Sequence, residues 1–191
     1  MSRSTSSKAL FSAKNIAYIS LFSALIAICS WVSIPTIIPF TLQTFAVSLC
    51  IGLLGTRRAL LSIGIYLLLG AAGVPVFSGF SGGMGVLFGT TGGYLVGFLL
   101  MALVSGVIIS RFGRSFLSLF LAFCFGLALC YAFGTAWYLL LYLRNTGPMG
   151  LSTALMRCVV PFLLPDAVKL SLAALATKRL GITSDAKAFF L

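Results

Sequence analysis

Two residues near the carboxyl end of the chain, Asp166 and Lys169, have the types and the spacing to recognise a polar ligand. An acid and a base three positions apart share one face of a helix. Lys169 precedes Lys178 by nine residues, about 13.5 Å along a helix, so it lies deep in an apolar stretch. Each charge placed there costs roughly 2.5–3.5 kcal/mol to insert into a bilayer. The pair therefore predicts either a structural ion pair or a polar substrate site.

Two prolines, Pro161 and Pro165, precede this pair at a spacing of four. They predict an interruption through 157–165 and a regular helix that begins at Pro165 or Asp166. Asp166 would then cap free N–H groups at the helix N-terminus. Charged residues beside an interrupted helix in a membrane favour a substrate site over a purely structural pair.

The residue types that are missing exclude most enzymatic chemistry. The chain has no His and only two acidic residues, which excludes a Ser-His-Asp triad and an imidazole base. No phosphate-binding G-x-x-x-x-G-K-[ST] motif occurs, so the chain is not expected to hydrolyse ATP through a P-loop. We therefore expect no catalytic site, no metal and no resident cofactor.

The elements that must position Asp166 and Lys169 are membrane helices. Of the 191 residues, 60% are hydrophobic and 8% are charged, against about 25% charged in soluble domains. Four stretches of the chain could form helices that cross a membrane core about 30 Å thick: 15–56, 59–110, 115–143 and 151–177. By length, the first two stretches allow two crossings each and the last two allow one each. Two of the spans are expected at about 59–73 and 93–110. The predicted fold is an all-α membrane domain of six helices over residues 15–180, with interrupted helices and tails at 1–14 and 181–191.

The basic residues predict the orientation of these spans. With six spans, ten of the 13 Lys and Arg residues fall on the side that holds both ends of the chain. The positive-inside rule therefore predicts a protein of the cell membrane with both ends of the chain on the cytoplasmic side. The net charge of +11 then needs no nucleic-acid partner, because the basic residues lie in short loops between spans.

Three further features could bind a ligand or a partner. The Gly-rich stretch 73–98 is expected to be an outer loop before about Thr91, and its aromatics (Phe77, Phe80 and Tyr94) could cover a flat ligand; tight helix packing is the alternative. Gln43 is a weak candidate near the outer end. Small residues four apart in the first helix, Ser20 with Ala24 and Ser23 with Ala27, allow close helix approach, within the chain or to another subunit.

In this order, these segments resemble a known family, the biotin-specific S component of energy-coupling factor transporters (the BioY family). The resemblance covers about residues 15–180. It is carried by IPFTLQT after the first helix, PVFSGFSGG and TGGY in the middle, and PF-x-x-PD-x-x-K at the end. It implies six helices with both ends cytoplasmic. It also implies a transmembrane coupling (T) subunit and two cytoplasmic ATPase subunits as partners.

The resemblance also implies the site. Asp166 and Lys169 match the family's substrate-binding acid and base, Gly92, Gly93 and Tyr94 its TGGY segment, and Gln43 its TLQT segment. Its docking motif on the first helix falls on Ser20 and Ala24. Biotin offers two ureido N–H donors to Asp166, while Lys169 or Arg157 could pair with its carboxylate. The alternatives are an S component for another vitamin, or an autonomous facilitator or ion-coupled carrier.

Overall fold

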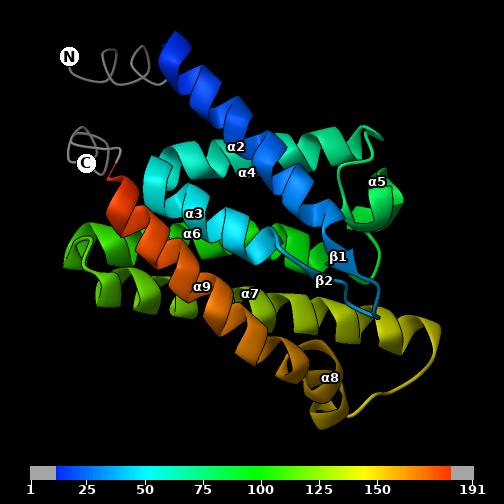
Figure 1. The fold of residues 1–191 in the computed structure, drawn as a ribbon. Helices are drawn as coiled ribbons and strands as arrows, with labels where there is room; N and C mark the ends of the chain where they lie inside the picture. Colours follow the sequence, from blue (N-terminus) through cyan, green and yellow to red (C-terminus); the bar gives the residue numbers. More distant parts are fainter. Residues whose placement is uncertain (1–11, 182–191) are drawn as a thin grey trace, which may run out of the picture.

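The structure, a computed structural model, describes residues 12–181 and is mostly helical there. Figure 1 shows long helices packed side by side, with short elements at one end of the bundle. In chain order the elements are α2 (Ala13–Trp31), β1 (Ser33–Ile34), β2 (Phe40–Thr41), α3 (Gln43–Leu54), α4 (Thr56–Ala71), the 3-10 turn η1 (Ser78–Phe80), α5 (Met84–Leu87), α6 (Gly92–Phe112), α7 (Phe116–Asn145), α8 (Leu151–Cys158) and α9 (Val160–Leu180).

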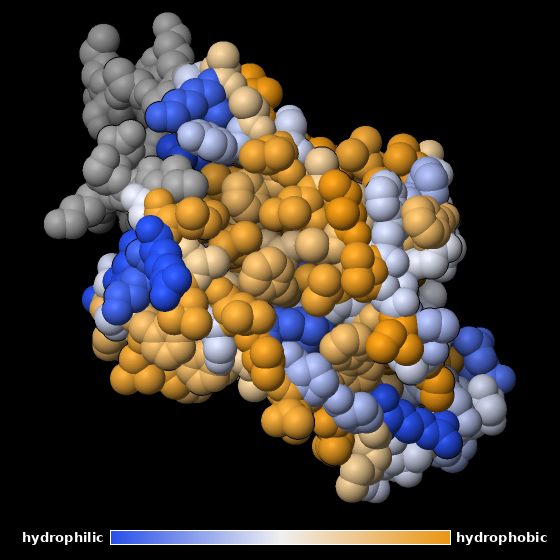
Figure 2. Space-filling view, viewed as in Figure 1, coloured by the Kyte–Doolittle hydropathy of each residue, from blue (hydrophilic) through white to orange (hydrophobic). Residues whose placement is uncertain are grey.

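Four of the described helices are long and apolar enough to cross a membrane: α2, α6, α7 and α9. Two further helices of the bundle are shorter: α3 has 12 residues and α4 has 16. The face seen in Figure 2 is mainly hydrophobic over the middle of the bundle, with hydrophilic residues gathered toward its ends. Such a surface suits lipid and not water, so the chain is a multi-pass membrane protein.

The junctions where basic residues concentrate lie at one end of the bundle. The start of α2, the α3–α4 junction, the α6–α7 turn and the end of α9 meet there in Figure 1. The predicted tail residues 1–11 and 182–191 lie outside the described residues. The opposite end carries the β1–β2 hairpin, the loop 72–91 and α8.

Two irregular segments separate the helices at this end, the hairpin and the Gly-rich loop that the sequence predicts. β1 and β2 pair antiparallel with Ser33 opposite Thr41, and Pro35 and Pro39 lie in the turn between them. The loop contains only η1 and the single turn α5, and α6 begins at Gly92. Of the glycines in this stretch, Gly92, Gly93 and Gly97 belong to α6 and Gly85 to α5, so they do not share one continuous helix.

The start of α9 differs from the prediction. The helix begins at Val160, not at Pro165 or Asp166, and the interruption lies at Val159, whose backbone leaves the helical region. Pro161 is tolerated because the first N–H groups of a helix have no intrahelical partner. Pro165 lies inside the helix and deprives the Pro161 carbonyl of its usual donor. Asp166 therefore stands in the second turn and does not cap the helix.

Candidate functional site

A cavity of about 200 Å³ opens at the end of the bundle that carries the hairpin and the loop 72–91. Its wall comes from segments far apart in the sequence. They are the hairpin and the start of α3 (Ile38, Pro39, Thr41, Gln43, Thr44), the loop (Phe77, Ser78, Ser81, Val86, Thr91), α6 (Tyr94, Leu95, Phe98), α7 (Leu127, Cys130, Tyr131), and α8 and α9 (Cys158, Phe162, Asp166, Lys169).

Asp166 and Lys169 form a buried ion pair on the cavity wall. The Lys169 Nζ lies 2.7 Å from Asp166 Oδ1, and the two residues are 6% and 2% exposed. The same ammonium donates to the Thr41 carbonyl oxygen at 2.6 Å and lies 3.8 Å from the centre of the Phe40 ring. Ion pair, hydrogen bond and cation–π contact together offset the cost of burying the charge.

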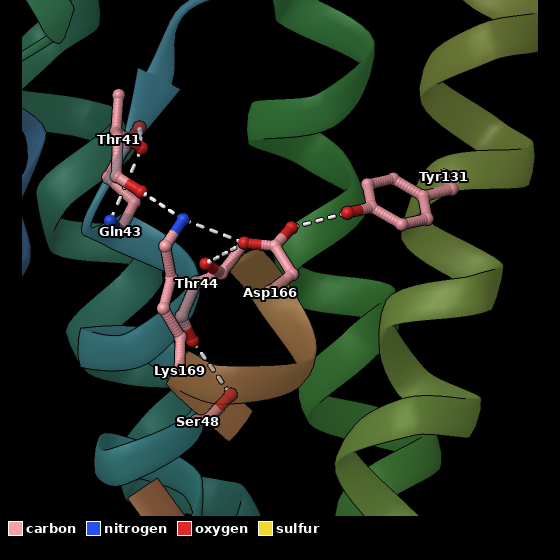
Figure 3. A network of polar contacts seen from close by, with 7 residues as sticks. All are labelled: Thr41, Gln43, Thr44, Ser48, Tyr131, Asp166 and Lys169. Carbon is pink, nitrogen blue, oxygen red and sulfur yellow. Dashed lines mark hydrogen bonds and ion pairs between the residues drawn. The ribbon is translucent and has the colours of Figure 1, made fainter. Parts of the chain in front are cut away.

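The Asp166 carboxylate has two further donors, which Figure 3 shows reaching it from different helices. Thr44 Oγ1 on α3 donates to Oδ1 at 2.9 Å, and the Tyr131 hydroxyl on α7 donates to Oδ2. The carboxylate is thus held from α3, α7 and α9 at once.

Gln43 belongs to a second set of hydrogen bonds on the same wall. Its Nε2 donates to the Tyr66 hydroxyl oxygen at 2.7 Å, and its Oε1 accepts from Thr41 Oγ1 at 3.0 Å. Two of its four side-chain hydrogen-bonding positions are used in this way, which leaves one N–H and one oxygen lone pair for a ligand.

Aromatic side chains supply much of the rest of the wall. Phe77 is 1% exposed and meets the Tyr66 ring edge-on at 5.4 Å. Tyr94 projects from the start of α6, and its hydroxyl pairs with Thr135 Oγ1 at 2.9 Å. The result is a mainly apolar cavity in which the charged pair forms a polar corner, a form suited to small ligands that carry a few polar groups.

Several predicted site residues lie outside the cavity wall. Gly92 and Gly93 sit at tight packing contacts: an added Cβ at Gly92 would meet the Leu87 carbonyl, and one at Gly93 would meet Trp137 of α7. Phe80 is 64% exposed and stacks on Trp31 at 5.1 Å. Arg157 is exposed on α8. The structure therefore brings Asp166, Lys169, Gln43, Tyr94 and Phe77 together and leaves these four aside.

Thr41, Thr44 and Tyr131 are cavity residues that the sequence analysis missed. The first two lie within IPFTLQT, so that segment already contained the signal. Tyr131 lies in a long apolar run with no motif around it. Its position at the acid results from the packing of α7 against α9, which one sequence does not reveal.

The two pairs of small residues on α2 point in different directions. Ser23 and Ala27 are buried, and Ser23 Oγ bonds to the Ser62 carbonyl oxygen of α4 at 2.8 Å, as expected for packing within the chain. Ser20 and Ala24 are exposed on the outer face of the helix. That face is open to a lipid or to another subunit.

Comparisons with known proteins agree with one another. The sequence model of the BioY family matches residues 2–184. A biotin transporter BioY of Thermotoga maritima is 41% identical over 161 residues, covering 84% of this chain and 91% of the relative. A probable biotin transporter BioY of Pyrococcus horikoshii is 36% identical over 169 residues, covering 88% and 96%.

The fold also has a counterpart of known structure. The crystal structure of the S-component for biotin from an ECF-type ABC transporter superposes with a TM-score of 0.81 at 24% sequence identity. The match covers 93% of this chain and 96% of that chain. The two chains therefore share an architecture over nearly their whole length.

Proposed function

The chain belongs to the BioY family, and we propose that it is the biotin-binding S component of an energy-coupling factor transporter. In this role it captures biotin on the outer side of the cell membrane and delivers it to the cytoplasm. The observation that carries the proposal is the buried Asp166–Lys169 pair on the wall of a mainly apolar cavity.

The polar corner matches the chemistry of biotin. The ureido ring has two N–H donors and one carbonyl, and a carboxylate ends the aliphatic tail. Asp166 accepts from a ureido N–H, and Lys169 donates to the carbonyl or to the tail carboxylate. Tyr94, Phe77 and Gln43 complete the site around the bicycle. Arg157 is the less suitable partner for the carboxylate because it lies exposed on α8, away from the cavity wall.

The proposed topology has six spans, α2, α3, α4, α6, α7 and α9, with both ends cytoplasmic. Its support is that the junctions rich in Lys and Arg meet at one end of the bundle, with the cavity toward the other. Under the positive-inside rule the basic end faces the cytoplasm. The cavity then faces the outside, from which a vitamin is captured.

Energy for release must come from other subunits, since the sequence has no P-loop. We assign this to a transmembrane coupling subunit and two cytoplasmic ATPases. The exposed Ser20–Ala24 face of α2 is the proposed contact with the coupling subunit, because small side chains let another helix approach closely.

Biotin binding by the purified chain tests the proposal. Isothermal titration of the detergent-solubilised protein, with thiamine and riboflavin as competitors, should give biotin binding that the other two vitamins do not displace. Asp166→Asn and Lys169→Ala should weaken it at least a hundredfold, and Asp185→Asn, at the chain's other acidic residue, is the matched control. Unchanged binding in both variants would remove the site assignment.

The same preparation separates the alternatives. Preferential binding of thiamine or riboflavin would identify an S component for another vitamin. Vesicles that contain only this chain should not accumulate biotin, and accumulation without ATPase subunits would instead identify an autonomous carrier.

A further inference from the structure

Hydrogen bonds within the protein occupy most, but not all, of the acceptor positions of the Asp166 carboxylate. Each carboxylate oxygen accepts about two hydrogen bonds. Oδ1 accepts from Thr44 at 2.9 Å and from Lys169 at 2.7 Å, which fills it. Oδ2 accepts from Tyr131, so one acceptor position remains, beside the Tyr131 oxygen.

Tyr131 decides where that remaining position points. A carboxylate that is anchored through Oδ1 alone can still turn about its Cβ–Cγ bond. The Tyr131 hydroxyl, which comes from the opposite side in Figure 3, fixes Oδ2 and stops this rotation. A hydrogen bond to a charged acceptor is also stronger than one between neutral groups.

Two other buried tyrosines of the bundle, Tyr94 and Tyr138, do not have this relationship to the acid. Tyr94 lines the same cavity, but its hydroxyl pairs with Thr135 of α7. Tyr138, seven residues after Tyr131 on α7, is 3% exposed and packs against Tyr142 with ring centres 6.0 Å apart. A buried tyrosine in this bundle can thus be satisfied without Asp166.

We propose that Tyr131 is a positioning residue of the ligand site. It orients the Asp166 carboxylate so that the remaining acceptor position on Oδ2 faces the N–H donor of a bound polar ring. Thr44 does the same for Oδ1 from α3. This assignment rests on the proposed function, because it needs a ligand that donates to Asp166.

A double-mutant cycle tests the proposal in the full-length protein. Tyr131→Phe removes one hydrogen bond to a charged group and should weaken biotin binding about tenfold. In the Asp166→Asn background the same change should have no further effect, because Tyr131 acts through the acid. Thr44→Val should behave alike, and Tyr138→Phe should leave the affinity unchanged. Effects that simply add, or a Tyr131→Phe affinity within twofold of wild type, would overturn the proposal.

Carboxyl NMR provides a readout that needs no measurable affinity in the variants. The chain has only two acidic residues, both Asp, so protein labelled with ¹³C at the aspartate carboxyl carbon gives two such signals. The signal that Asp166→Asn removes should move in Tyr131→Phe protein before ligand is added, and should stay in place in Tyr138→Phe protein. An unmoved signal in Tyr131→Phe would also overturn the proposal.

The outcomes distinguish this proposal from the proposed function. If wild-type protein binds thiamine or riboflavin in place of biotin, the biotin assignment fails and the cycle is run with that vitamin. If biotin binds and the cycle is additive, the function stands and the role of Tyr131 fails. If none of the three vitamins binds or moves the Asp166 signal, both proposals fail.

Discussion

The Lys169 ammonium lies 2.7 Å from Asp166 Oδ1 and 2.6 Å from the Thr41 carbonyl oxygen, so one side chain links α9 to the end of β2. Both charged groups are nearly inaccessible. Charges that are buried this deeply are stable only when paired. The pair is therefore both the polar corner of the cavity and a tie between the hairpin and the helix bundle.

Breaking the pair should be worse than removing it. Lys169→Met leaves Asp166 as a buried carboxylate without its counter-charge, and we expect it to cost about 3–5 kcal/mol of stability. Asp166→Asn/Lys169→Met removes both charges and should recover part of that loss, although neither protein should bind biotin. Thermal unfolding in detergent measures the difference. A double variant less stable than Lys169→Met would contradict this electrostatic account.

Two aromatics of the Gly-rich loop should differ in their effect on ligand binding. Phe77 lines the cavity, and its ring fills the space at Gly70 that a side chain would otherwise occupy. Truncating a buried Phe costs about 3–5 kcal/mol, so Phe77→Ala should weaken both the fold and biotin binding.

Phe80→Ala is the matched control for that variant. It removes an exposed ring that stacks on Trp31 away from the cavity. Its biotin affinity, measured by the same titration, should stay within twofold of wild type. An equal loss in the two variants would mean that Phe80 also covers the ligand, as the sequence alone suggested.

Charge and hydrophobicity were sufficient to predict most of the helices. The expected spans 59–73 and 93–110 correspond to α4 (Thr56–Ala71) and α6 (Gly92–Phe112). The predicted start of α9 was wrong, because the spacing of two prolines does not show which turn of a helix each proline occupies. The interruption lies instead at Val159, where neither a glycine nor a proline marks a break in the sequence.

The sequence pointed to those residues of the candidate site that lie close together in sequence or within a recognisable segment. Asp166, Lys169 and Gln43 are of this kind. Tyr131 reaches Asp166 across 35 positions, and only the packing of α7 against α9 brings the two together. Gly92 and Gly93 also lie in a recognisable segment. In the structure, however, the missing side chains make room for Leu87 and Trp137, so these glycines are explained by packing and not by contact with a ligand.

Two helix glycines should respond in opposite directions to the same substitution. A Cβ at Gly93 would meet Trp137 and the Gly134 backbone of α7, so Gly93→Ala should destabilise the protein by about 1–3 kcal/mol through overpacking. Gly64 on α4 has nothing within 4 Å of the added Cβ, and Gly64→Ala should stabilise by up to about 1 kcal/mol.

Thermal unfolding separates the two glycine variants, and titration of the folded Gly93→Ala protein adds a second result. Its biotin affinity should match that of wild type if Gly93 serves α6–α7 packing alone. A weaker affinity at unchanged stability would return Gly93 to the ligand site.

The exposed face of α2 should be needed for assembly and not for ligand capture. Ala24→Leu places a large side chain between the proposed coupling subunit and the helix, where close approach needs small residues. Copurification with the native coupling subunit and ATPases should be lost, while biotin binding by the isolated chain stays within twofold of wild type. Ala132→Leu makes the same change at an exposed position of α7 and should leave both properties intact. Ala27→Leu enlarges a buried residue of α2 and should reduce stability instead. If the Ala24→Leu protein copurifies as well as wild type, the coupling subunit does not dock on this face, because close helix approach needs a small residue there.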